Sequence, residues 1–499
     1  MRADLPGAAV LSAVFVGLLL AAEIWRRFGH AKPEWTRKLV HLGGGIACLF
    51  FPFLVHSPWV VLAMALALTS LFALAGRFGF LQSLHGIGRR SRGAEYYPLS
   101  VFLVFLLSRG RPWLYLPAVL VLAVADAFAA LIGSRYGLLR YEVEDEKKSL
   151  EGSLVFMVIA FLVIHLPVLL MTDLPRPVCV LAALLVAALV TGFEAISLHG
   201  SDNLFVPLAV VVILGKITRK PLDEVVFQNL SLLAICLGVG ILVWRSRPLN
   251  VGGAIAFVLF AYGAWSLGNW QWALPAFLGF AAYVAGWYFL APPRHESGVK
   301  VRTVSRALLA PFLVLIVANS SDTFAPAFGP YLAACGAVLA FSLGSGVFPL
   351  ERPGGLRGLL AAAGWGALAC ALTALPLWLV EGLPARSLLL VATVVIAASL
   401  ANTAVERRRP PAAAAEAMAA APATTTTAAG RVRHTAPAED APVAPRRREW
   451  TASRFLLTLL AAGAILGLQA LGVTAEWKPD TGPLGPSISG VAGAVRAVR

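Results

Sequence analysis

Three short polar motifs interrupt an otherwise apolar chain, and their side chains are suited to binding phosphate and a metal ion. Residues 147–152 read Lys-Lys-Ser-Leu-Glu-Gly, which combines two cations, a hydroxyl and a carboxylate. Upstream, Asp126 lies inside the apolar run 120–132, and downstream Asp202-Asn203 interrupts another apolar stretch. Because only 13% of the residues are charged, chemistry on a polyanion is expected at these three motifs.

The composition indicates an all-α integral membrane protein. Apolar residues make up 59% of the chain, and the mean hydropathy is +0.78. Apolar runs of about 17–25 residues recur, each long enough to cross ~30 Å of hydrocarbon as a helix. Transmembrane strands would alternate polar and apolar residues instead. We therefore predict a polytopic transmembrane helical bundle of about 14–16 spans in two membrane domains. The first run, residues 7–25, is interpreted as a retained helix rather than a signal peptide.

The predicted spans group into two membrane domains. The first covers residues 1–228, and the second, of unassigned function, covers residues 229–405. Residues 406–453, with Ala, Pro and Thr repeats, are typical of a disordered linker, and residues 454–499 hold a final span and a flexible tail. The spans are predicted at about residues 7–25, 39–56, 58–76, 97–108, 113–133, 152–171, 176–198, 203–215, 229–244, 250–268, 270–290, 304–324, 328–349, 356–380, 385–404 and 454–473.

Charge and cysteine content exclude several classes of protein. The net charge of +15 lies mostly beside the predicted spans. Basic residues there set topology and contact membrane lipids, so no nucleic-acid partner is expected. The five cysteines are scattered through apolar segments and indicate neither a disulfide framework nor a metal cluster. The polar cluster 319–323 in the second domain is explained by capping at the end of a span. The oligomeric state is not indicated.

Basic residues predict on which side of the membrane each loop lies. In the first domain, 13 Lys and Arg residues fall in one set of alternate loops and two in the other. If every predicted span crosses once, residues 147–152 and Asp202-Asn203 lie on the richer side. Asp126 lies roughly 10 Å from that end of its helix, at 1.5 Å per residue. The positive-inside rule makes this side cytoplasmic, and we expect a bacterial inner membrane protein whose active site faces the cytoplasm. The richer loops are residues 26–38, 77–96 and 134–151.

Asp126 has a structural and a functional interpretation. A carboxylate inside an apolar helix is costly unless it has a partner or a water-filled cavity, so it could make a structural hydrogen bond or bind a ligand. Ala130, Gly133 and Gly137 follow at near-helical spacing and form a small-residue face. That face allows either close helix packing or close approach of a ligand to the backbone.

The basic motif has the same two interpretations. Lys147 and Lys148 alone would be topology signals. However, Ser149, Glu151 and Gly152 follow at the start of the next span. A helix N-terminus favours phosphate, the lysines add positive charge, and Glu151 could hold a metal ion that bridges phosphates.

Asp202-Asn203 is either a helix cap or part of a site. Asp and Asn are favoured N-cap residues. Glu194, eight residues earlier in an otherwise apolar span, favours the functional interpretation, because carboxylates inside a membrane are usually functional.

Taken together, the motifs occur in an order that resembles a known family. They are Arg37-Lys38-Leu-Val-His41-Leu-Gly43, Glu95-Tyr-Tyr-Pro98-Leu, Asp126-Ala-Phe-Ala-Ala-Leu-Ile-Gly133-Ser-Arg-Tyr-Gly137, Lys148-Ser-Leu-Glu151-Gly152-Ser153, and Glu194 with Asp202-Asn203-Leu-Phe-Val-Pro207. This pattern, over about residues 30–215, resembles the dolichol kinase and phytol kinase family of the membrane cytidylyltransferase-like superfamily.

The resemblance implies a kinase that transfers the γ-phosphate of CTP, or less often another NTP, to an isoprenoid alcohol such as phytol, farnesol, geranylgeraniol or a polyprenol. The acidic segment 142–146, which we expect to be a solvated loop, departs from the basic or neutral residues more usual in this family, which bears on nucleotide preference. The resemblance also implies a nucleotide site formed by Asp126, Gly133, Gly137, Lys148, Ser149, Glu151 and Gly152.

The residue types themselves fit phosphoryl transfer, which needs positioning and charge neutralisation. Neither a phosphate-binding loop nor a protein-kinase Gly-rich motif occurs in the sequence. We expect Mg²⁺ or Mn²⁺ to be bound by Asp126 with Asp202 or Glu151. Lys148 is expected to contact phosphate, and Asp202 or Glu194 to orient or deprotonate the lipid hydroxyl.

Further residues are expected at the edge of the site. Arg135 and Asn203 are predicted nucleotide contacts. Arg37, Lys38 and His41 could contact phosphate or anchor the chain to lipid headgroups. Two other functions are compatible with the sequence: a cytidylyltransferase that forms a CDP-lipid, and a transporter or flippase whose buried carboxylates relay protons.

Overall fold

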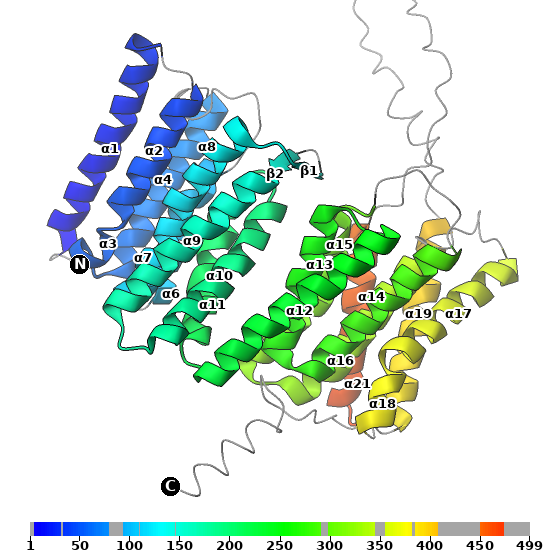
Figure 1. The fold of residues 1–499 in the computed structure, drawn as a ribbon. Helices are drawn as coiled ribbons and strands as arrows, with labels where there is room; N and C mark the ends of the chain where they lie inside the picture. The colour runs from blue at the N-terminus through cyan, green and yellow to red at the C-terminus, as the bar shows by residue number, and fades with distance from the viewer. Residues whose placement is uncertain are drawn as a thin grey trace, which may run out of the picture. The chain divides into compact units, whose positions relative to one another are not determined.

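Membrane-length helices make up most of the protein (Figure 1). In the part of the chain that the structure describes, 14 helices are long and apolar enough to cross a membrane. The prediction of an all-α polytopic membrane protein is therefore confirmed. The computed structural model describes residues 4–30, 33–78, 93–108, 110–144, 146–290, 298–344, 355–381, 385–407 and 450–473.

The chain forms two compact units, and the candidate site lies in the first. This unit comprises Met1–Tyr262 and Ser297–Val301. Three of its elements, α7, η2 and α8, form one continuous span, Pro112–Tyr136. The helices of the unit are α1 (Leu5–Phe28), α2 (Pro33–Cys48), α3 (Phe51–Leu54), α4 (Pro58–Phe78), α6 (Gly93–Ser108), α7 (Pro112–Leu120), the π-helical turn η2 (Val121–Ala125), α8 (Asp126–Tyr136), α9 (Leu150–Met171), α10 (Arg176–Ile196), α11 (Asp202–Ile217), α12 (Leu222–Ser246) and α13 (Val251–Gly263).

The first unit extends beyond residue 228, where the sequence places the end of the first domain. Helices α12 and α13 belong to it. Buried polar side chains explain why: Tyr262 donates a hydrogen bond to Gln228 at 2.8 Å, and Asn229 donates to the carbonyl oxygen of Leu181 in α10 at 3.2 Å. These bonds satisfy groups that would be costly to leave unpaired away from water.

A β-hairpin connects α8 to α9 and corrects the expectation of a loop at residues 142–146. Strands β1 (Arg140–Val143) and β2 (Glu146–Ser149) pair antiparallel, with Tyr141 opposite Lys148. Side chains alternate between the two faces of a strand, and Val143 is fully buried. The hairpin gives the basic motif a defined register, so that Lys147 is exposed and Lys148 is largely buried.

The second unit has an aromatic core around Trp272, whose carbonyl oxygen accepts a hydrogen bond from Tyr331 at 2.7 Å. In the polar cluster 319–323, Asn319 donates to the carbonyl oxygen of Leu267 at 2.9 Å. The predicted linker lies almost wholly outside the described residues, as does the predicted tail from residue 474 onward. The elements are η3 (Ala264–Gly268), α14 (Trp270–Leu290), α15 (Val301–Ser321), α16 (Phe324–Ser342), α17 (Gly355–Thr373), α18 (Leu375–Glu381), α19 (Ala385–Arg407) and α21 (Ala452–Ala470).

Candidate active site

Asp126 begins α8 directly after the π-helical turn η2, and this turn organises its surroundings. The peptide N–H of Asp126 bonds to the carbonyl oxygen of Val121, five residues back. An α-helix would pair that N–H with Leu122, but the Leu122 carbonyl oxygen instead accepts from Nε2 of His41 at 2.8 Å. Since a carbonyl only accepts, Nε2 carries a proton. The same nitrogen lies 3.5 Å from Oδ2 of Asp126. π-Helical turns are frequent at functional sites.

A glycine and a tyrosine hold His41 in this position. A Cβ on Gly45 would lie only 2.2 Å from the Cβ of Ala123, so α2 can approach η2 only because this residue has no side chain. Tyr97 of α6 packs edge-on against the His41 ring, with centroids 5.0 Å apart, and its hydroxyl donates to the His41 carbonyl at 3.5 Å. Elements from three parts of the chain therefore orient the ring beside Asp126.

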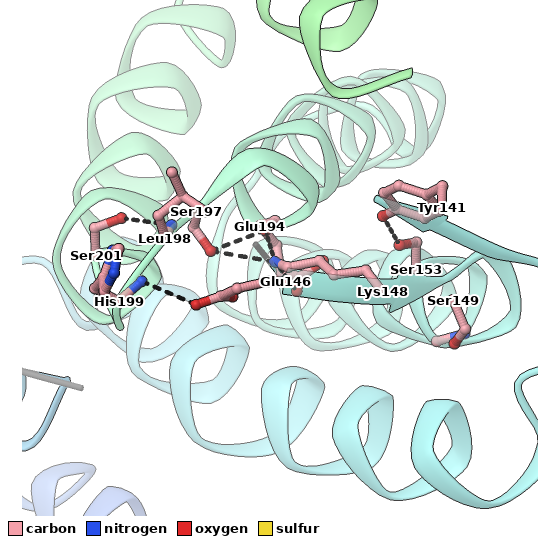
Figure 2. Close-up of polar contacts among 11 residues, drawn as sticks. Tyr141, Glu146, Lys148, Ser149, Ser153, Glu194, Ser197, Leu198, His199 and Ser201 are labelled. Atoms are coloured by element: carbon pink, nitrogen blue, oxygen red, sulfur yellow. Dashed lines mark hydrogen bonds and ion pairs between the residues drawn. The ribbon is translucent and has the colours of Figure 1, made fainter. Parts of the chain in front are cut away.

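Lys148 in β2 is bound to the C-terminal end of α10 (Figure 2). Its Nζ donates to Oε1 of Glu194 at 2.8 Å, to Oγ of Ser197 at 3.3 Å and to the Glu194 carbonyl oxygen. All three N–H groups of the ammonium are thus used. Burial lowers the pKa of Lys148, but the charges of Glu194 and Asp202 outweigh it and hold the pKa above its ordinary value. The ammonium stays charged, and a phosphate would bind it by exchange with one of these acceptors.

Ser149 and Glu151 organise the N-terminus of α9 and the segment that follows α8. Ser149 is the N-cap residue, and its Oγ accepts from the Gly152 N–H at 3.1 Å. Oε1 of Glu151 accepts from the backbone N–H groups of Leu138 and Leu139, each at 3.0 Å. Both side chains therefore have structural partners, although Oε2 of Glu151 is buried without a hydrogen-bond partner among the described residues. Their nucleotide and metal roles stay predictions.

The predicted glycines lie where α8 packs against α9. A Cβ on Gly133 would lie 2.8 Å from Oγ of Ser149, and one on Gly137 would lie 2.3 Å from the Gly133 carbonyl oxygen. A Cβ on Gly152 would lie 3.2 Å from the Ala129 carbonyl oxygen. The small-residue face thus serves close helix packing. Contact between these glycines and a nucleotide stays a prediction.

A tight turn between α10 and α11 carries the Asp202-Asn203 motif. His199 and Gly200 have φ angles of 56° and 83°, the left-handed region that reverses the chain here. The His199 N–H donates to Oε1 of Glu146 at 3.4 Å, which ties the turn to β2 (Figure 2). Asn203 donates from Nδ2 to the Gly93 carbonyl oxygen at 2.9 Å and so joins the starts of α11 and α6.

Asp202 is the first residue of α11, and Ser201 occupies the N-cap position without a side-chain cap bond. Helix capping therefore does not account for Asp202. Its Oδ1 is buried and has no hydrogen-bond partner among the described residues. The charges of Asp126, Lys148 and Glu194 all act on this carboxyl group. Asp202 is thus coupled electrostatically to Asp126 on one side of the site and to the Lys148–Glu194 pair on the other.

A metal ion would have two nearby carboxylates to bind rather than a complete protein cage. Where the structure describes the chain, no three His, Cys, Asp or Glu side chains form a metal site by themselves. Mg²⁺ is usually held by one or two carboxylates together with substrate phosphates. Asp126 and Asp202, of which Asp202 has a buried oxygen without a partner, fit that mode.

The other predicted residues lie around this centre in different surroundings. Arg37 is exposed and lines one end of an apolar cavity. Nζ of Lys38 lies 5.8 Å from the centroid of the Trp35 ring, and the exposed Arg135 guanidinium lies 5.5 Å from the Tyr136 ring. Lys38 and Arg135 are therefore placed on aromatic neighbours, and their phosphate and nucleotide contacts stay predictions.

Three contacts in the site were not predicted from the sequence, although Tyr97 lies in the motif Glu95-Tyr-Tyr-Pro98. Tyr97 orients His41, Ser197 binds Lys148, and the Leu122 carbonyl accepts from His41. Ser197 follows Glu194 by three residues and could have been noticed as its helical neighbour. A π-helical turn has no comparable pattern in the sequence, so the contact with the Leu122 carbonyl could not be predicted.

Comparison with known proteins identifies a relative of the first unit's size. The chain is 36% identical over 206 residues to the phytol kinase of Synechocystis sp., and the match covers 41% of this chain and 88% of that relative. No protein-family model matches the chain. No solved structure matches it.

Proposed function

This chain belongs to the phytol kinase family, and we propose that it transfers the γ-phosphate of a nucleotide, CTP in the first instance, to the hydroxyl of an isoprenoid alcohol. The observation that carries the proposal is the position of Asp202. Its buried, unpaired carboxylate oxygen lies within electrostatic range of Asp126 and of the Lys148–Glu194 pair. Phosphoryl transfer needs this combination of cation-binding and phosphate-binding groups in one place.

In this proposal Asp126 and Asp202 hold Mg²⁺ or Mn²⁺ together with the nucleotide phosphates. The ion would neutralise phosphate charge and fix the reacting group. Two carboxylates repel each other when close together, and a bound cation removes that repulsion. Nε2 of His41 donates to the Leu122 carbonyl oxygen and also lies 3.5 Å from Oδ2 of Asp126. In this proposal His41 thereby orients the Asp126 carboxylate.

Lys148 and Glu194 have coupled roles in the proposal. When Lys148 contacts phosphate, it gives up one of its present acceptors, Glu194 or Ser197. A Glu194 carboxylate released in this way can accept the proton of the attacking hydroxyl. Asp202 is the alternative proton acceptor. The kinetics of Glu194→Gln and Asp202→Asn distinguish these two candidates.

The labelling experiment uses purified protein, a panel of isoprenoid alcohols, and CTP labelled at either the α or the γ position. We expect label in the lipid only from the γ position. Label from the α position alone would establish a cytidylyltransferase and refute the proposal. Parallel reactions with labelled ATP determine nucleotide preference.

A matched pair of variants tests the assignment of Asp126. Asp126→Asn is expected to lower the rate at least 100-fold, because charge on the metal-binding oxygens is lost. Glu142→Gln, which also removes one carboxylate, is the control, since the Glu142 side chain is 71% exposed. Equal activity of the two variants would contradict the assignment.

We also propose that the site faces the cytoplasm of a bacterial inner membrane, on the basis of the basic loops. Inside-out membrane vesicles should therefore use CTP added to the medium, whereas sealed right-side-out vesicles should not. The opposite result would reverse the orientation.

A further inference from the structure

We propose that the cavity between α1, α2, α4 and α6 holds the isoprenoid chain of the substrate, and that Gly44 keeps it open to more than two isoprenoid units. The inference rests on the proposed function for the identity of the occupant. It goes further by assigning a binding site and a residue that determines chain length.

The cavity is polar at one end only. Arg37, His41 and Asn203 line that end, near the N-termini of α2 and α11. The walls beyond are almost entirely aliphatic and aromatic, with Val61 and Met64 of α4 among them. A molecule with one polar end and a long apolar body matches this distribution.

The polar end connects directly to the candidate active site. His41 lines the cavity, and its Nε2 lies 3.5 Å from Oδ2 of Asp126. Asn203 also lines the cavity and follows Asp202 in the chain. A hydroxyl at this end therefore lies beside the acidic residues of the site, whereas a chain inserted the other way round would bury its hydroxyl among apolar walls.

The length of the cavity follows from the helix positions that line it. Lining residues on α2 run from Arg37 to Cys48, and this interval corresponds to roughly 16 Å at 1.5 Å per residue. On α4 they run from Val61 to Phe72, again roughly 16 Å. Phe51, which is 3% exposed, lies at the end away from Arg37.

That length corresponds to a chain of limited size. Three extended single bonds of a peptide backbone advance about 3.6 Å, so a carbon chain of similar geometry covers ~16 Å with about 13 bonds. An isoprenoid unit contributes four bonds to the main chain. The cavity therefore holds about three units, and the fourth unit of a C20 alcohol reaches the Phe51 end.

Gly44 is the position at which this length can be changed. It lines the cavity roughly 10 Å from Arg37 along α2. A Cβ there would lie 3.6 Å from the Phe15 ring, an ordinary contact. A larger side chain would extend into the cavity and leave space for about two units.

The kinetic test compares Gly44→Leu with the wild type on geraniol, farnesol and geranylgeraniol. We expect kcat/KM for geranylgeraniol to fall at least 10-fold more than kcat/KM for geraniol, because the variant blocks only the distal part of the chain. Gly17→Leu is the matched control, since Gly17 of α1 has nothing within 4 Å of its Cβ position. Retained activity on geraniol shows that the variant is folded, and equal effects on all three alcohols would overturn the inference.

A binding experiment tests the same site without catalysis. A geranylgeraniol analogue with a photoactivatable diazirine at its distal end is irradiated with the wild-type protein, without nucleotide. Labelling of residues around Cys48, Phe51 and Val61 is expected, with competition by unlabelled alcohol. Labelling elsewhere, or competition by phospholipid but not by alcohol, would overturn the inference. Correct labelling without phosphoryl transfer would instead refute the proposed function alone.

Discussion

The buried ion pair between Lys148 and Glu194 yields the sharpest stability prediction. The two side chains are 16% and 14% exposed, and their charged atoms lie 2.8 Å apart. Lys148→Met removes the cation and leaves the Glu194 carboxylate without its partner. Breaking a buried pair in this way costs about 3–5 kcal/mol. Since both groups retain some exposure, we expect the lower end, about 3 kcal/mol.

A double-mutant cycle separates the interaction free energy of the ion pair from the effects of changing the shape of each side chain. Glu194→Gln alone leaves a buried ammonium with a neutral partner and is also expected to destabilise. The double variant, Lys148→Met with Glu194→Gln, leaves neither charge unpaired, and replacing a whole buried pair is often neutral. We therefore expect it to lie within about 1 kcal/mol of the wild type.

The assay is the free energy of unfolding in mixed micelles, measured for all four members of the cycle. Lys147→Met is the matched control, because Lys147 lies next to Lys148 but is 67% exposed and 4.0 Å from the exposed Glu142. Its loss should be no more than about 0.5 kcal/mol. If the two lysine variants lose the same stability, or if the double variant loses the sum of the single losses, the reasoning is refuted.

Kinetics of the same variants separate two roles of Glu194. If Glu194 only holds Lys148, Glu194→Gln changes KM for the nucleotide and leaves kcat within a few-fold. If it accepts the proton of the alcohol, kcat falls roughly 100-fold or more, and the fall diminishes as pH is raised.

Two further predictions concern helix packing and the metal ion. Gly133→Ala should lower the free energy of unfolding by about 1–3 kcal/mol, because the new Cβ meets Oγ of Ser149 at 2.8 Å and the Gly152 backbone at 3.2 Å; Gly17→Ala, with open space around it, should not, and equal losses would contradict the packing argument. Asp202→Asn should raise the Mg²⁺ concentration for half-maximal activity at least 10-fold, since one metal-binding charge is lost; an unchanged Mg²⁺ titration would remove Asp202 from the metal site.

Much of the fold could be predicted from the sequence, because the bilayer leaves few alternatives. Backbone groups inside hydrocarbon must bond to each other, and continuous apolar runs can do so only as helices. The sequence does not predict the short hairpin, although Tyr141 and Val143 alternate with charged residues at the start of the acidic segment 142–146, which is interpreted as a loop. Its strands are four residues each, and the pattern was too short to outweigh the acidic composition.

The domain boundary illustrates a second limit. Apolar runs show where spans lie but not which spans pack together. Gln228 of α12 pairs with Tyr262 of α13 across 34 positions, and the neighbouring Asn229 bonds to Leu181 of α10. Together these contacts link α12 and α13 to the rest of the first unit.

In the site, the amino-acid sequence is enough to identify the residues that are chemically capable. Asp126, Lys148, Glu194 and Asp202 are charged groups in a chain that has few, and their types predict phosphate and metal chemistry. Their pairing becomes visible once the helices are packed. Lys148 meets Glu194 across 46 positions and His41 meets the Leu122 carbonyl across 81. Hydrophobic periodicity orients each helix toward the interior but carries no information about which partner it meets there. That choice depends on close contacts such as Gly45 against η2, which exist only once the helices have packed.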